Sequence, residues 1–441
     1  MTFDFFEGPA GTGKTHSLIA LAEEVVGGGV LGDEAKLLAL TFMNGSRQRL
    51  DSHLRQQAAF RRRFDCQTLD VFARRLVSRR RSLITSAMRA QIAALNEFDG
   101  PCSLAASLLE DGSVRQWIAR TFPLVLVDEA QDLDEHRVRI LQGLSKSCQI
   151  IAAADAFQCL RDGRETGSLI EWLETAGRTH RLTQPQRTQR QGLLAAALAV
   201  RNGKDVTAVL KPNIWKGGTT WNGAGFRLTD VPVKTGALLS WSIANDIAQR
   251  AGRVVVLTPD AGSGIIRAAL NTVQTKHYER QNGSRFGPFQ VAWERHHTEE
   301  ADALLDSLKI PSAASWADLR LLLSPLAERA AIAGAIGRMD RLRRTQGQSS
   351  FSAAEVREFV RDAVRDRARF GVSLPRGHLA MTIQQAKNRE FPNVIVLWPH
   401  TATGSAEHLR RLLYNGITRA QNHCTVIVLG RGRLNGPPFS S

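Results

Sequence analysis

A glycine-rich segment near the N-terminus constrains the fold of this chain most. It reads Gly8-Pro9-Ala10-Gly11-Thr12-Gly13-Lys14-Thr15 and fits the P-loop pattern Gly-x4-Gly-Lys-Thr. A short β-type run, Thr2 to Phe6, precedes it, and a helix-patterned stretch, Ser17 to Val26, follows it. Backbone N–H groups of such a loop surround phosphates at a helix N-terminus. The segment therefore predicts a nucleotide-binding α/β domain.

Short, continuously apolar runs recur further along the chain. They lie at residues 36–42, 124–127, 150–154, 254–257, 394–397 and 424–429. Runs of this kind belong to parallel sheets that helices cover on both faces. Since 441 residues at about 150 per domain give roughly three domains, we expect more than one hydrophobic core. By contrast, the glycine-rich segment 211–233 has the character of an irregular loop or linker.

Basic residues exceed acidic ones by a wide margin. The formal net charge is +16, and between Arg47 and Arg89 twelve arginines face three acidic residues. Nucleic-acid phosphates are the favoured counter-charge, because a basic surface gains affinity by releasing the counterions condensed on them. General arginine richness without a polyanionic partner is the alternative.

Composition excludes several other classes of protein. Hydrophobic residues make up 43% and charged residues 23%, which is typical of a folded globular chain. No apolar run approaches the roughly 18 residues that cross a bilayer, and the first residues lack the basic region of a signal peptide. The five cysteines form no Cys-x-x-Cys pair. We therefore expect a cytoplasmic protein with reduced thiols and no membrane partner.

An acidic pair follows the apolar run 124–127. Asp128 and Glu129 stand where the second half of a P-loop site is expected, at the end of a buried strand. Thr15 and Asp128 would hold Mg²⁺, Lys14 would neutralise the outer phosphates of ATP, and Glu129 would polarise the attacking water. Taken alone, the two acids could instead cap a helix N-terminus.

The P-loop and seven further segments, in order from residue 8 to residue 420, resemble the superfamily 1A helicases of the UvrD/Rep/PcrA type. Besides the P-loop, they are Thr41-Phe42-Met43-Asn44, Thr68-Leu69-Asp70-Val71-Phe72, Asp128-Glu129-Ala130-Gln131-Asp132, Asp155 to Gln158, Arg187 in Gln184 to Thr188, Met381-Thr382-Ile383 with Ala386-Lys387 and Glu390, and Tyr414 to Ala420. Each match is weak by itself. Their order makes the resemblance specific.

The resemblance implies a role for each matched position. Gln158, Arg187 and Arg419 would act at the γ-phosphate together with Lys14 and Glu129. Glu390 would bind the ribose, and the loop from Gly8 to His16 would hold the phosphates. DNA would contact Thr41, Asn44, Thr68 and Thr382, and we add Arg79, Arg80 and Arg81 from the arginine cluster.

The resemblance also implies the architecture. Two RecA-like P-loop lobes of the α/β class, with parallel sheets flanked by helices, would carry two small helical inserts. The first lobe (1A) would comprise residues 1–72 and 121–190, and the second (2A) residues 191–305 and 377–441. The inserts would be a 1B-like segment, 73–120, and a 2B-like segment, 306–376. Both inserts are short for the family.

Four departures from the family pattern qualify these roles. No counterpart of the family's upstream adenine-reading glutamine is expected, and Gln186 replaces the tyrosine that stacks on adenine, which predicts relaxed base selectivity. Cys159 to Arg164 replace aromatic residues that stack on DNA bases. Trp215 and Trp221 could supply relocated stacking or be ordinary core residues. Asn388 replaces a glycine and would tolerate a left-handed turn.

Three functional hypotheses remain at this point. The first is an ATP-dependent DNA translocase or helicase that moves on single-stranded or partly duplex DNA, 3′ to 5′ by resemblance. The second is a nucleotide-dependent DNA-sensing subunit that docks onto a nuclease or other protein subunit, in DNA repair or in antiviral defence of the Gabija type. The third, an inactive structural paralogue, is disfavoured because the catalytic residues are all present.

Overall fold

Apolar strands that alternate with helices organise the chain into two compact units. The computed structural model describes residues 2–92, 95, 99–160, 167–215, 218–232, 236–280, 282–294, 304–306, 308, 310–370 and 377–440. The first unit comprises Met1–Gln290 and Thr382–Ser441, and the second comprises Val291–Met381. None of the described helices is long and apolar enough to cross a membrane.

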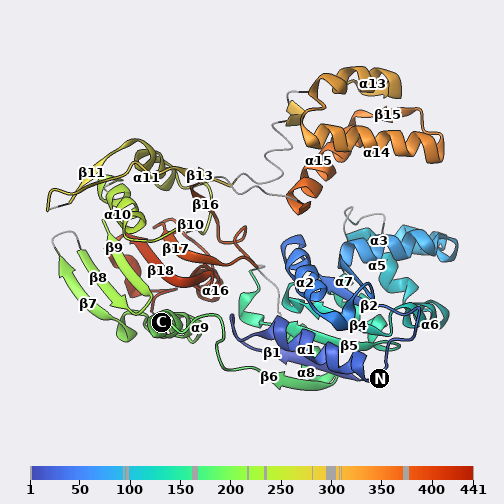
Figure 1. Cartoon of the computed structure of the whole chain (residues 1–441), viewed down its shortest axis with the longest axis horizontal. Coiled ribbons are helices and arrows are strands. Elements are labelled where there is room, and N and C mark those ends of the chain that lie inside the picture. The colour runs from blue at the N-terminus through green and yellow to red at the C-terminus, as the bar shows by residue number, and fades with distance from the viewer. Residues whose placement is uncertain are drawn as a thin grey trace. The chain divides into compact units, whose positions relative to one another are not determined.

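A parallel sheet forms the centre of the N-terminal part of the first unit (Figure 1). Its described strands pair in the order β3-β2-β4-β5-β1-β6. The strands are β1 (Phe3–Glu7), β2 (Leu37–Thr41), β3 (Phe64–Thr68), β4 (Leu124–Asp128), β5 (Gln149–Ala154) and β6 (Arg178–Arg181). β1, β2, β4 and β5 confirm the strands expected from the apolar runs.

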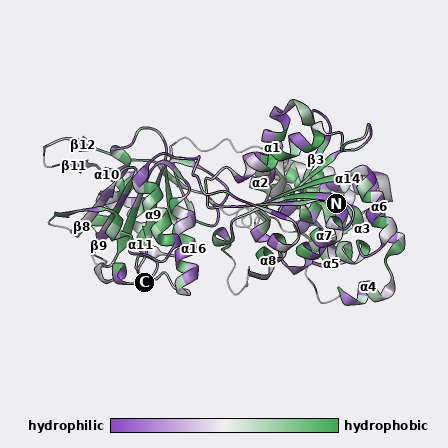
Figure 2. Cartoon of the chain, turned by 90° about the horizontal axis from the view of Figure 1, so that it is seen from below, coloured by the Kyte–Doolittle hydropathy of each residue, from purple (hydrophilic) through white to green (hydrophobic). Residues whose placement is uncertain are grey.

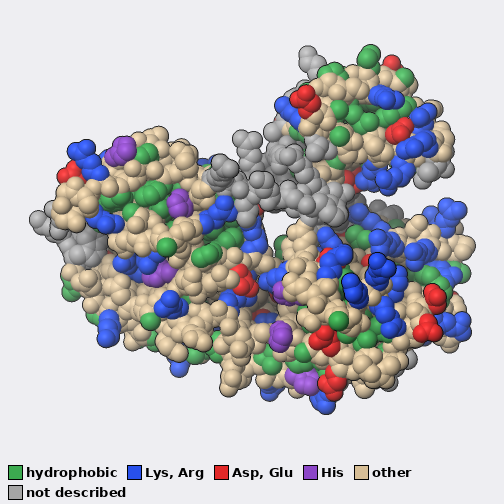
Figure 3. Space-filling model, viewed as in Figure 1, with side chains coloured by type: hydrophobic (Ala, Val, Ile, Leu, Met, Phe, Trp, Pro, Cys, Tyr) green, Lys and Arg blue, Asp and Glu red, His purple; other side chains and the backbone are tan. Residues whose placement is uncertain are grey.

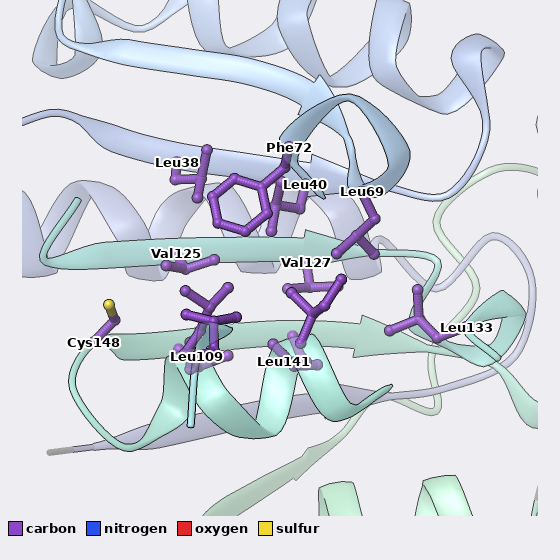
Figure 4. Close-up of a cluster of buried hydrophobic side chains, with 14 of the residues drawn as sticks. Leu38, Leu40, Leu69, Phe72, Leu109, Val125, Val127, Leu133, Leu141 and Cys148 are labelled. Atoms are coloured by element: carbon purple, nitrogen blue, oxygen red, sulfur yellow. The ribbon is translucent and has the colours of Figure 1, made fainter. Parts of the chain in front are cut away.

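Helices cover both faces of this sheet. They are α1 (Lys14–Gly27), α2 (Asn44–Gln56), α3 (Leu69–Arg79), α4 (Ser86–Gln91), α5 (Asp99–Leu108), α6 (Gly112–Thr121), α7 (Glu135–Ser145) and α8 (Gly167–Thr175). Leu38 and Val125 point to the core shared with α3, α5 and α7 (Figure 4), whereas Leu37 and Leu124 point to the core shared with α1 and α2. Both cores are buried, which explains why these strands are continuously apolar.

A second sheet lies in the remainder of the first unit. Within that unit its described strands pair in the order β10-β17-β18-β9-β8-β7. They are β7 (Lys211–Trp215), β8 (Gly218–Gly223), β9 (Phe226–Val231), β10 (Val254–Thr258), β17 (Phe391–Trp398) and β18 (Ala420–Leu429), with a two-stranded ribbon of β11 (Tyr278–Glu279) and β12 (Arg285–Phe286). The accompanying helices are α9 (Gln191–Arg201), α10 (Gly236–Ala248), α11 (Gly264–Thr275) and α16 (Ala406–Ile417). The first sheet is parallel and the second is mixed, since β10, β17, β18 and β9 pair in parallel and β7 and β8 pair antiparallel. Two such sheets flanked by helices confirm the α/β class and are consistent with two RecA-like lobes.

The expectation of an irregular loop over residues 211–233 is wrong. β7, β8 and β9 form antiparallel pairs there, and Trp221 lies on β8 opposite Leu228 of β9. The glycines mark turns between short strands; Gly225, for example, has φ 78°, in the left-handed region that favours glycine. Half-polar strands of this kind lack the continuous apolar run that identified the parallel strands. The Trp215 side chain lies outside the described residues.

The second unit has its own hydrophobic core. It is built from α13 (Trp316–Leu323), α14 (Ala330–Gln346) and α15 (Ala353–Phe370), with a hairpin of β14 (Ala313–Ser315) and β15 (Ser350–Ser352) and a parallel pair of β13 (Val291–Trp293) and β16 (His378–Thr382). Leu319, Ile332 and Val360 are buried together at its centre. Figure 2 shows apolar residues on the inner faces and polar residues on the outer faces of helices along the chain.

A buried arginine ties three helical segments of the first unit together. The Arg137 guanidinium on α7 donates to Asp70 Oδ1 on α3 at 3.0 Å and to Asp99 Oδ1 on α5 at 3.0 Å, and it also pairs with Asp134. Its charge lies 5.4 Å from the centre of the Phe42 ring. The side chains of Arg137 and Asp134 are 4% and 7% exposed, so loss of the arginine would leave the buried Asp134 carboxylate without this partner.

We predict that Arg137→Leu lowers the free energy of unfolding by about 3 kcal/mol, because removal of one partner from a buried ion pair leaves an uncompensated charge. Arg139→Leu, two positions away on α7, is the matched control. Its pair with Glu110 is exposed, so the expected loss is below about 1 kcal/mol. Urea unfolding of both variants measures the difference, and equal losses would contradict the prediction.

Candidate active site

The P-loop joins β1 to α1 in a conformation that its glycines require. Gly11 and Gly13 have φ values of 79° and 84°. A Cβ at Gly8 would lie 2.5 Å from the carbonyl oxygen of Leu182, so this position has no room for a side chain. The sequence Gly8 to Gly13 therefore produces a tight turn whose backbone leads into the N-terminus of α1.

Lys14 and Thr15 begin α1 and face different partners. Lys14 Nζ donates to the carbonyl oxygens of Gly8 at 2.8 Å and Pro9 at 2.9 Å, which holds its ammonium over the loop. Burial lowers the pKa of Lys14, although the carboxylates of Asp155 and Glu129 oppose that shift. A desolvated ammonium over a P-loop is suited to phosphate oxygens.

Thr15 meets Asp128 at the end of β4. Thr15 Oγ1 donates to Asp128 Oδ2 at 2.9 Å, so a hydroxyl and a carboxylate come together next to the loop. Burial, followed by the charge of Glu129, raises the pKa of Asp128 to about 6. The described residues contain no cluster of three or more His, Cys, Asp or Glu side chains that could hold a metal. The oxygen pair fits Mg²⁺, which takes few protein ligands and completes its shell with water and phosphate.

Glu129 is held by a chain of hydrogen bonds. Glu129 Oε2 accepts from Gln131 Nε2 at 2.6 Å, and Gln131 Oε1 accepts from the Asp155 backbone N–H at 3.1 Å. Burial favours the neutral acid, but Arg49 and Lys14 outweigh it, and the pKa of Glu129 lies below its ordinary value. Its backbone is in the left-handed region, with φ 60°. Such a fixed, ionised carboxylate is able to accept a proton.

Two arginines far apart in the sequence meet beside the P-loop. The Arg187 backbone N–H donates to the Gly11 carbonyl oxygen at 3.1 Å, and its guanidinium pairs with Glu390 at 2.8 Å and donates to the Thr418 carbonyl oxygen at 2.7 Å. Arg419 is 2% exposed, and its Nε donates to the Asn415 carbonyl oxygen at 3.0 Å. Residues 187 and 419 thus lie at one site with the loop.

Positive charge is concentrated at this site. Burial and the neighbouring Arg187 lower the pKa of Arg419 to about 10, and burial also lowers the pKa of Arg187. Burial raises the pKa of Glu390, but Arg187 and Gln421 outweigh it and keep that pKa below its ordinary value. A group of desolvated cations is stabilised by anions placed among them. The site is therefore electrostatically suited to a polyphosphate.

Sequence reasoning missed Arg49 as a site residue and counted it only among the basic cluster. Arg49 NH2 lies 3.5 Å from Glu129 Oε1, and its NH1 lies 3.6 Å from Glu390 Oε1. NH1 also donates to the Asn388 carbonyl oxygen at 3.3 Å. No local pattern marks this arginine, because its partners lie 80 and 341 positions further along the chain.

Two further links were missed although most of their residues lie inside the matched motifs; Arg201 lies outside them, on α9. Lys387 forms a buried ion pair with Asp132. The Tyr414 hydroxyl accepts from the Ala10 backbone N–H at 2.8 Å, and Arg201 donates to Asp155 Oδ1 at 2.8 Å next to it. Both links connect segments of the two sheets within the first unit.

Asn388 confirms the expectation of a left-handed turn. Its φ is 62°, and its Nδ2 donates to Ser46 Oγ at 2.6 Å. Asparagine adopts this conformation more easily than other non-glycine residues. The side chain that replaces the family glycine therefore anchors the turn to α2.

The remaining residues expected at the nucleotide lie near the loop. Gln158 is 4% exposed and ends a short 3₁₀ turn after β5, and its carbonyl oxygen lies 3.5 Å from Asn415 Nδ2. His16 is exposed on α1, and Thr12 is buried with its hydroxyl donating to the Pro9 carbonyl oxygen at 2.9 Å. Gln186 donates its backbone N–H to the Gly11 carbonyl oxygen at 2.6 Å.

The residues expected at DNA are four with uncharged polar side chains, described first, and three arginines. Thr41 is fully buried and donates to the Met43 carbonyl oxygen at 3.1 Å, and Thr68 is buried and caps α3 through the Val71 backbone N–H. These hydroxyls are engaged inside the protein and hold their segments in shape. Thr382 Oγ1 accepts from the Gln385 backbone N–H at 3.2 Å. The side chain of Asn44 lies outside the described residues.

The arginines expected at DNA lie at the end of α3 and just after it. Arg79 and Arg81 are exposed, whereas the Arg80 guanidinium lies 4.1 Å from the centre of the Trp117 ring. Figure 3 shows Lys and Arg side chains gathered over the region of α2 and α3. Their contact with DNA stays a prediction.

Two parts of the chain match models of known domain families. Residues 4–164 match the AAA domain, and residues 378–427 match the UvrD-like helicase C-terminal domain. This confirms the resemblance to UvrD-like superfamily 1 helicases. The N-terminal part of the chain is thus similar to AAA domains, and its C-terminal part is similar to a helicase domain.

Other comparisons are more distant. The crystal structure of arterivirus nonstructural protein 10, a helicase, matches with 11% identity over 97% of this chain and a TM-score of 0.34. The chain spans 59% of the length of that protein's chain. No curated protein sequence matches.

We predict that Lys14→Ala and Glu129→Gln separate nucleotide binding from chemistry. Lys14→Ala removes the ammonium over the loop and weakens binding of a fluorescent ATP analogue by about tenfold or more. Glu129→Gln keeps the shape of the side chain, so binding stays within about threefold while turnover falls by about 10²-fold or more. Lys36→Ala, at an exposed lysine, is the control and retains both. Equal turnover in wild type and Glu129→Gln would refute the role of Glu129.

Proposed function

We propose that the protein is a superfamily 1A, ATP-dependent DNA translocase and helicase that moves on single-stranded DNA in the 3′ to 5′ direction. The observation that carries this proposal is the meeting of the P-loop with Arg187, Glu390 and Arg419 from distant parts of the chain. A nucleotide at that site bridges these parts, so its hydrolysis changes how firmly they are held together.

The hydrolytic step in this proposal uses side chains that lie around the P-loop. ATP with Mg²⁺ supplies the phosphoryl group and a Lewis acid when bound, and Thr15 and Asp128 would hold the metal. Glu129, fixed by Gln131, accepts the proton of the attacking water. Lys14, Arg187 and Arg419 stabilise the charge that develops on the phosphate oxygens, and Gln158 and the loop from Gly8 to His16 orient them.

Glu390 is proposed to bind the ribose while it positions an arginine. Its Oε1 pairs with Arg187 at 2.8 Å, and its Oε2 accepts from Gln421 Nε2 at 3.3 Å. A carboxylate has about four acceptor positions, so one group serves both an arginine and sugar hydroxyls. The nucleotide thereby reinforces the position of Arg187.

The coupling to movement runs through buried polar contacts. The Asp132–Lys387 ion pair and the bond from Arg49 to Asn388 join segments that follow β4 and β2 to the segment before β17. We propose that loss of the γ-phosphate weakens these contacts, and that the two lobes then shift relative to a bound strand. Residues 73–120 and 306–376 are the reduced 1B-like and 2B-like inserts in this proposal.

DNA is proposed to be held by charge more than by stacking. Cys159 and Leu160 are buried after Gln158, and the positions 161–164 lie outside the described residues. The exposed arginines near the end of α3 offer guanidinium groups to phosphates instead.

We place this activity in the cytoplasm, whose reducing conditions suit a protein with five free cysteines.

A second candidate function is a nucleotide-dependent DNA sensor with a nuclease or other protein partner in repair or antiviral defence. It is favoured by the buried, non-aromatic residues that follow Gln158, because a sensor needs no base-stacking platform to move along a strand. Such a subunit would hydrolyse ATP and unwind little duplex by itself.

ATP hydrolysis with and without single-stranded DNA tests the proposal on the full chain. A translocase hydrolyses ATP faster with DNA and displaces a labelled strand from a duplex with a 3′ overhang. Stimulation without strand displacement or movement favours the sensor. Hydrolysis that is absent in both conditions would overturn both functions.

We predict that Arg187→Ala and Arg419→Ala each reduce ATP hydrolysis by about 10³-fold, because both guanidinium groups act on transition-state charge. Arg411→Ala is the control, since Arg411 lies on α16 and pairs with Glu407 outside the site. Thermal melting by circular dichroism checks that each variant is folded. Wild-type hydrolysis in either folded variant would show that the corresponding arginine does not act at the phosphate.

We predict that replacing Arg79, Arg80 and Arg81 with glutamine weakens single-stranded DNA binding alike for all sequences and flattens its salt dependence. The logarithm of affinity falls against the logarithm of salt concentration with a slope of about −0.7 per phosphate neutralised. ATP hydrolysis without DNA persists. Neutralising Arg115, Arg120 and Arg139 removes the same charge from α6 and α7 and serves as the control. Equal slopes for both triple variants would contradict a local DNA contact.

A further inference from the structure

The edge of the first sheet at β3 offers a template for an additional strand. Among the described strands only β2 pairs with β3, in parallel register from Leu37–Phe64 to Thr41–Thr68. A terminal strand presents the backbone N–H and C=O groups of its outer side. This edge lies away from the P-loop, because β1 is separated from β3 by three strands in the sheet order.

A groove runs between this edge and α2. It has a volume of about 540 Å³ and is lined by Arg47, Asp51, Arg55, Arg61, Arg62, Phe64, Asp65 and Cys66. Cys66 faces α2, since its thiol donates to the Arg47 carbonyl oxygen at 3.5 Å. Asp65 faces the other side of the sheet, where Arg75 of α3 pairs with it at 3.2 Å. Successive residues of β3 therefore point to opposite faces.

Arginines flank the edge on both faces. Arg47, Arg55, Arg61 and Arg62 lie on the side of α2, whereas Arg75 and Arg79 line a smaller cavity on the side of α3. Six arginines against Asp51 and Asp65 leave a local net charge of +4. An added strand would project its own side chains alternately to the two faces, so every residue of it would meet guanidinium groups.

The backbone of Arg62 is strained. Its φ is 61°, and the other non-glycine residues with positive φ among those described are Glu129 and Asn388, both at the nucleotide site. A glycine would relieve this strain, so the position retains arginine at a cost in stability. Arg63 next to it fixes the turn by donating to the carbonyl oxygens of Leu31 and Gly32 at 2.9 and 2.6 Å.

We propose that the β3 edge and its six arginines bind an extended acidic peptide of a partner protein, which adds as a strand beside β3. Backbone hydrogen bonds would give affinity, and consecutive Asp or Glu residues would give specificity. A nucleic acid strand satisfies the charge but leaves the backbone edge unused. The Arg55 guanidinium also lies 5.8 Å from the centre of the Phe64 ring, where a base would have to stack. This surface is separate from the nucleotide site, so the proposal goes beyond ATP-driven movement on DNA.

Fluorescence anisotropy of a labelled oligoglutamate peptide of about ten residues tests the proposal on the full chain. We expect saturable binding that Arg62→Gly weakens by about tenfold while the melting temperature stays the same or rises, because glycine relieves the left-handed backbone. Arg320→Ala, at an exposed arginine of the second unit, is the control and binds as wild type does. Unchanged affinity in Arg62→Gly would overturn the proposal.

Hydrogen exchange distinguishes an added strand from loose charge attraction. Peptide binding is expected to slow amide exchange in residues 64–68 of β3, because the outer N–H groups become bonded. Peptide binding without slower exchange there would refute strand addition. Tight binding of single-stranded oligothymidine, lost in Arg62→Gly, with no binding of the oligoglutamate would assign the groove to nucleic acid and overturn the peptide proposal.

Discussion

Concentrated positive charge beside the P-loop is the constraint on which the rest of the structure depends. Lys14, Arg187 and Arg419 are all desolvated, and the pKa of each is lowered by burial. Such cations persist together because Glu129, Glu390 and backbone carbonyl oxygens lie among them. A polyphosphate adds the missing negative charge, so binding of nucleotide and the joining of distant segments are one electrostatic event.

The architecture was predictable where a strand is buried on both faces. β4 and β5 stand out because helices cover both sides and no polar residue interrupts them. β3, with its sequence Phe-Asp-Cys-Gln-Thr, is an edge strand whose polar residues face α3, so no apolar run reveals it. The antiparallel strands over 211–231 were hidden for a related reason, since glycine turns and half-polar strands resemble a loop.

The candidate site was predictable to the extent that its chemistry sits in short motifs. The loop, Asp128 and Glu129 follow from local spacing, and the structure brings them together with Arg187 and Arg419. Arg49 and the Tyr414 hydroxyl were not predicted because their partners are set by the packing of segments hundreds of residues apart. Local sequence carries no signal for such pairings, whereas the left-handed conformation of Asn388 followed from the residue type alone.

Hydrogen exchange of the full chain with and without a non-hydrolysable ATP analogue and Mg²⁺ tests the central claim most directly. If one nucleotide binds both the P-loop and the segments around Arg187 and Arg419, it slows amide exchange in residues 8–15 and also in residues 187–188 and 415–420. These last two segments lie beside the P-loop or beside Arg187, which is bonded to it. Slower exchange confined to residues 8–15, with residues 187–188 and 415–420 unchanged at saturating nucleotide, would contradict the account of a shared site.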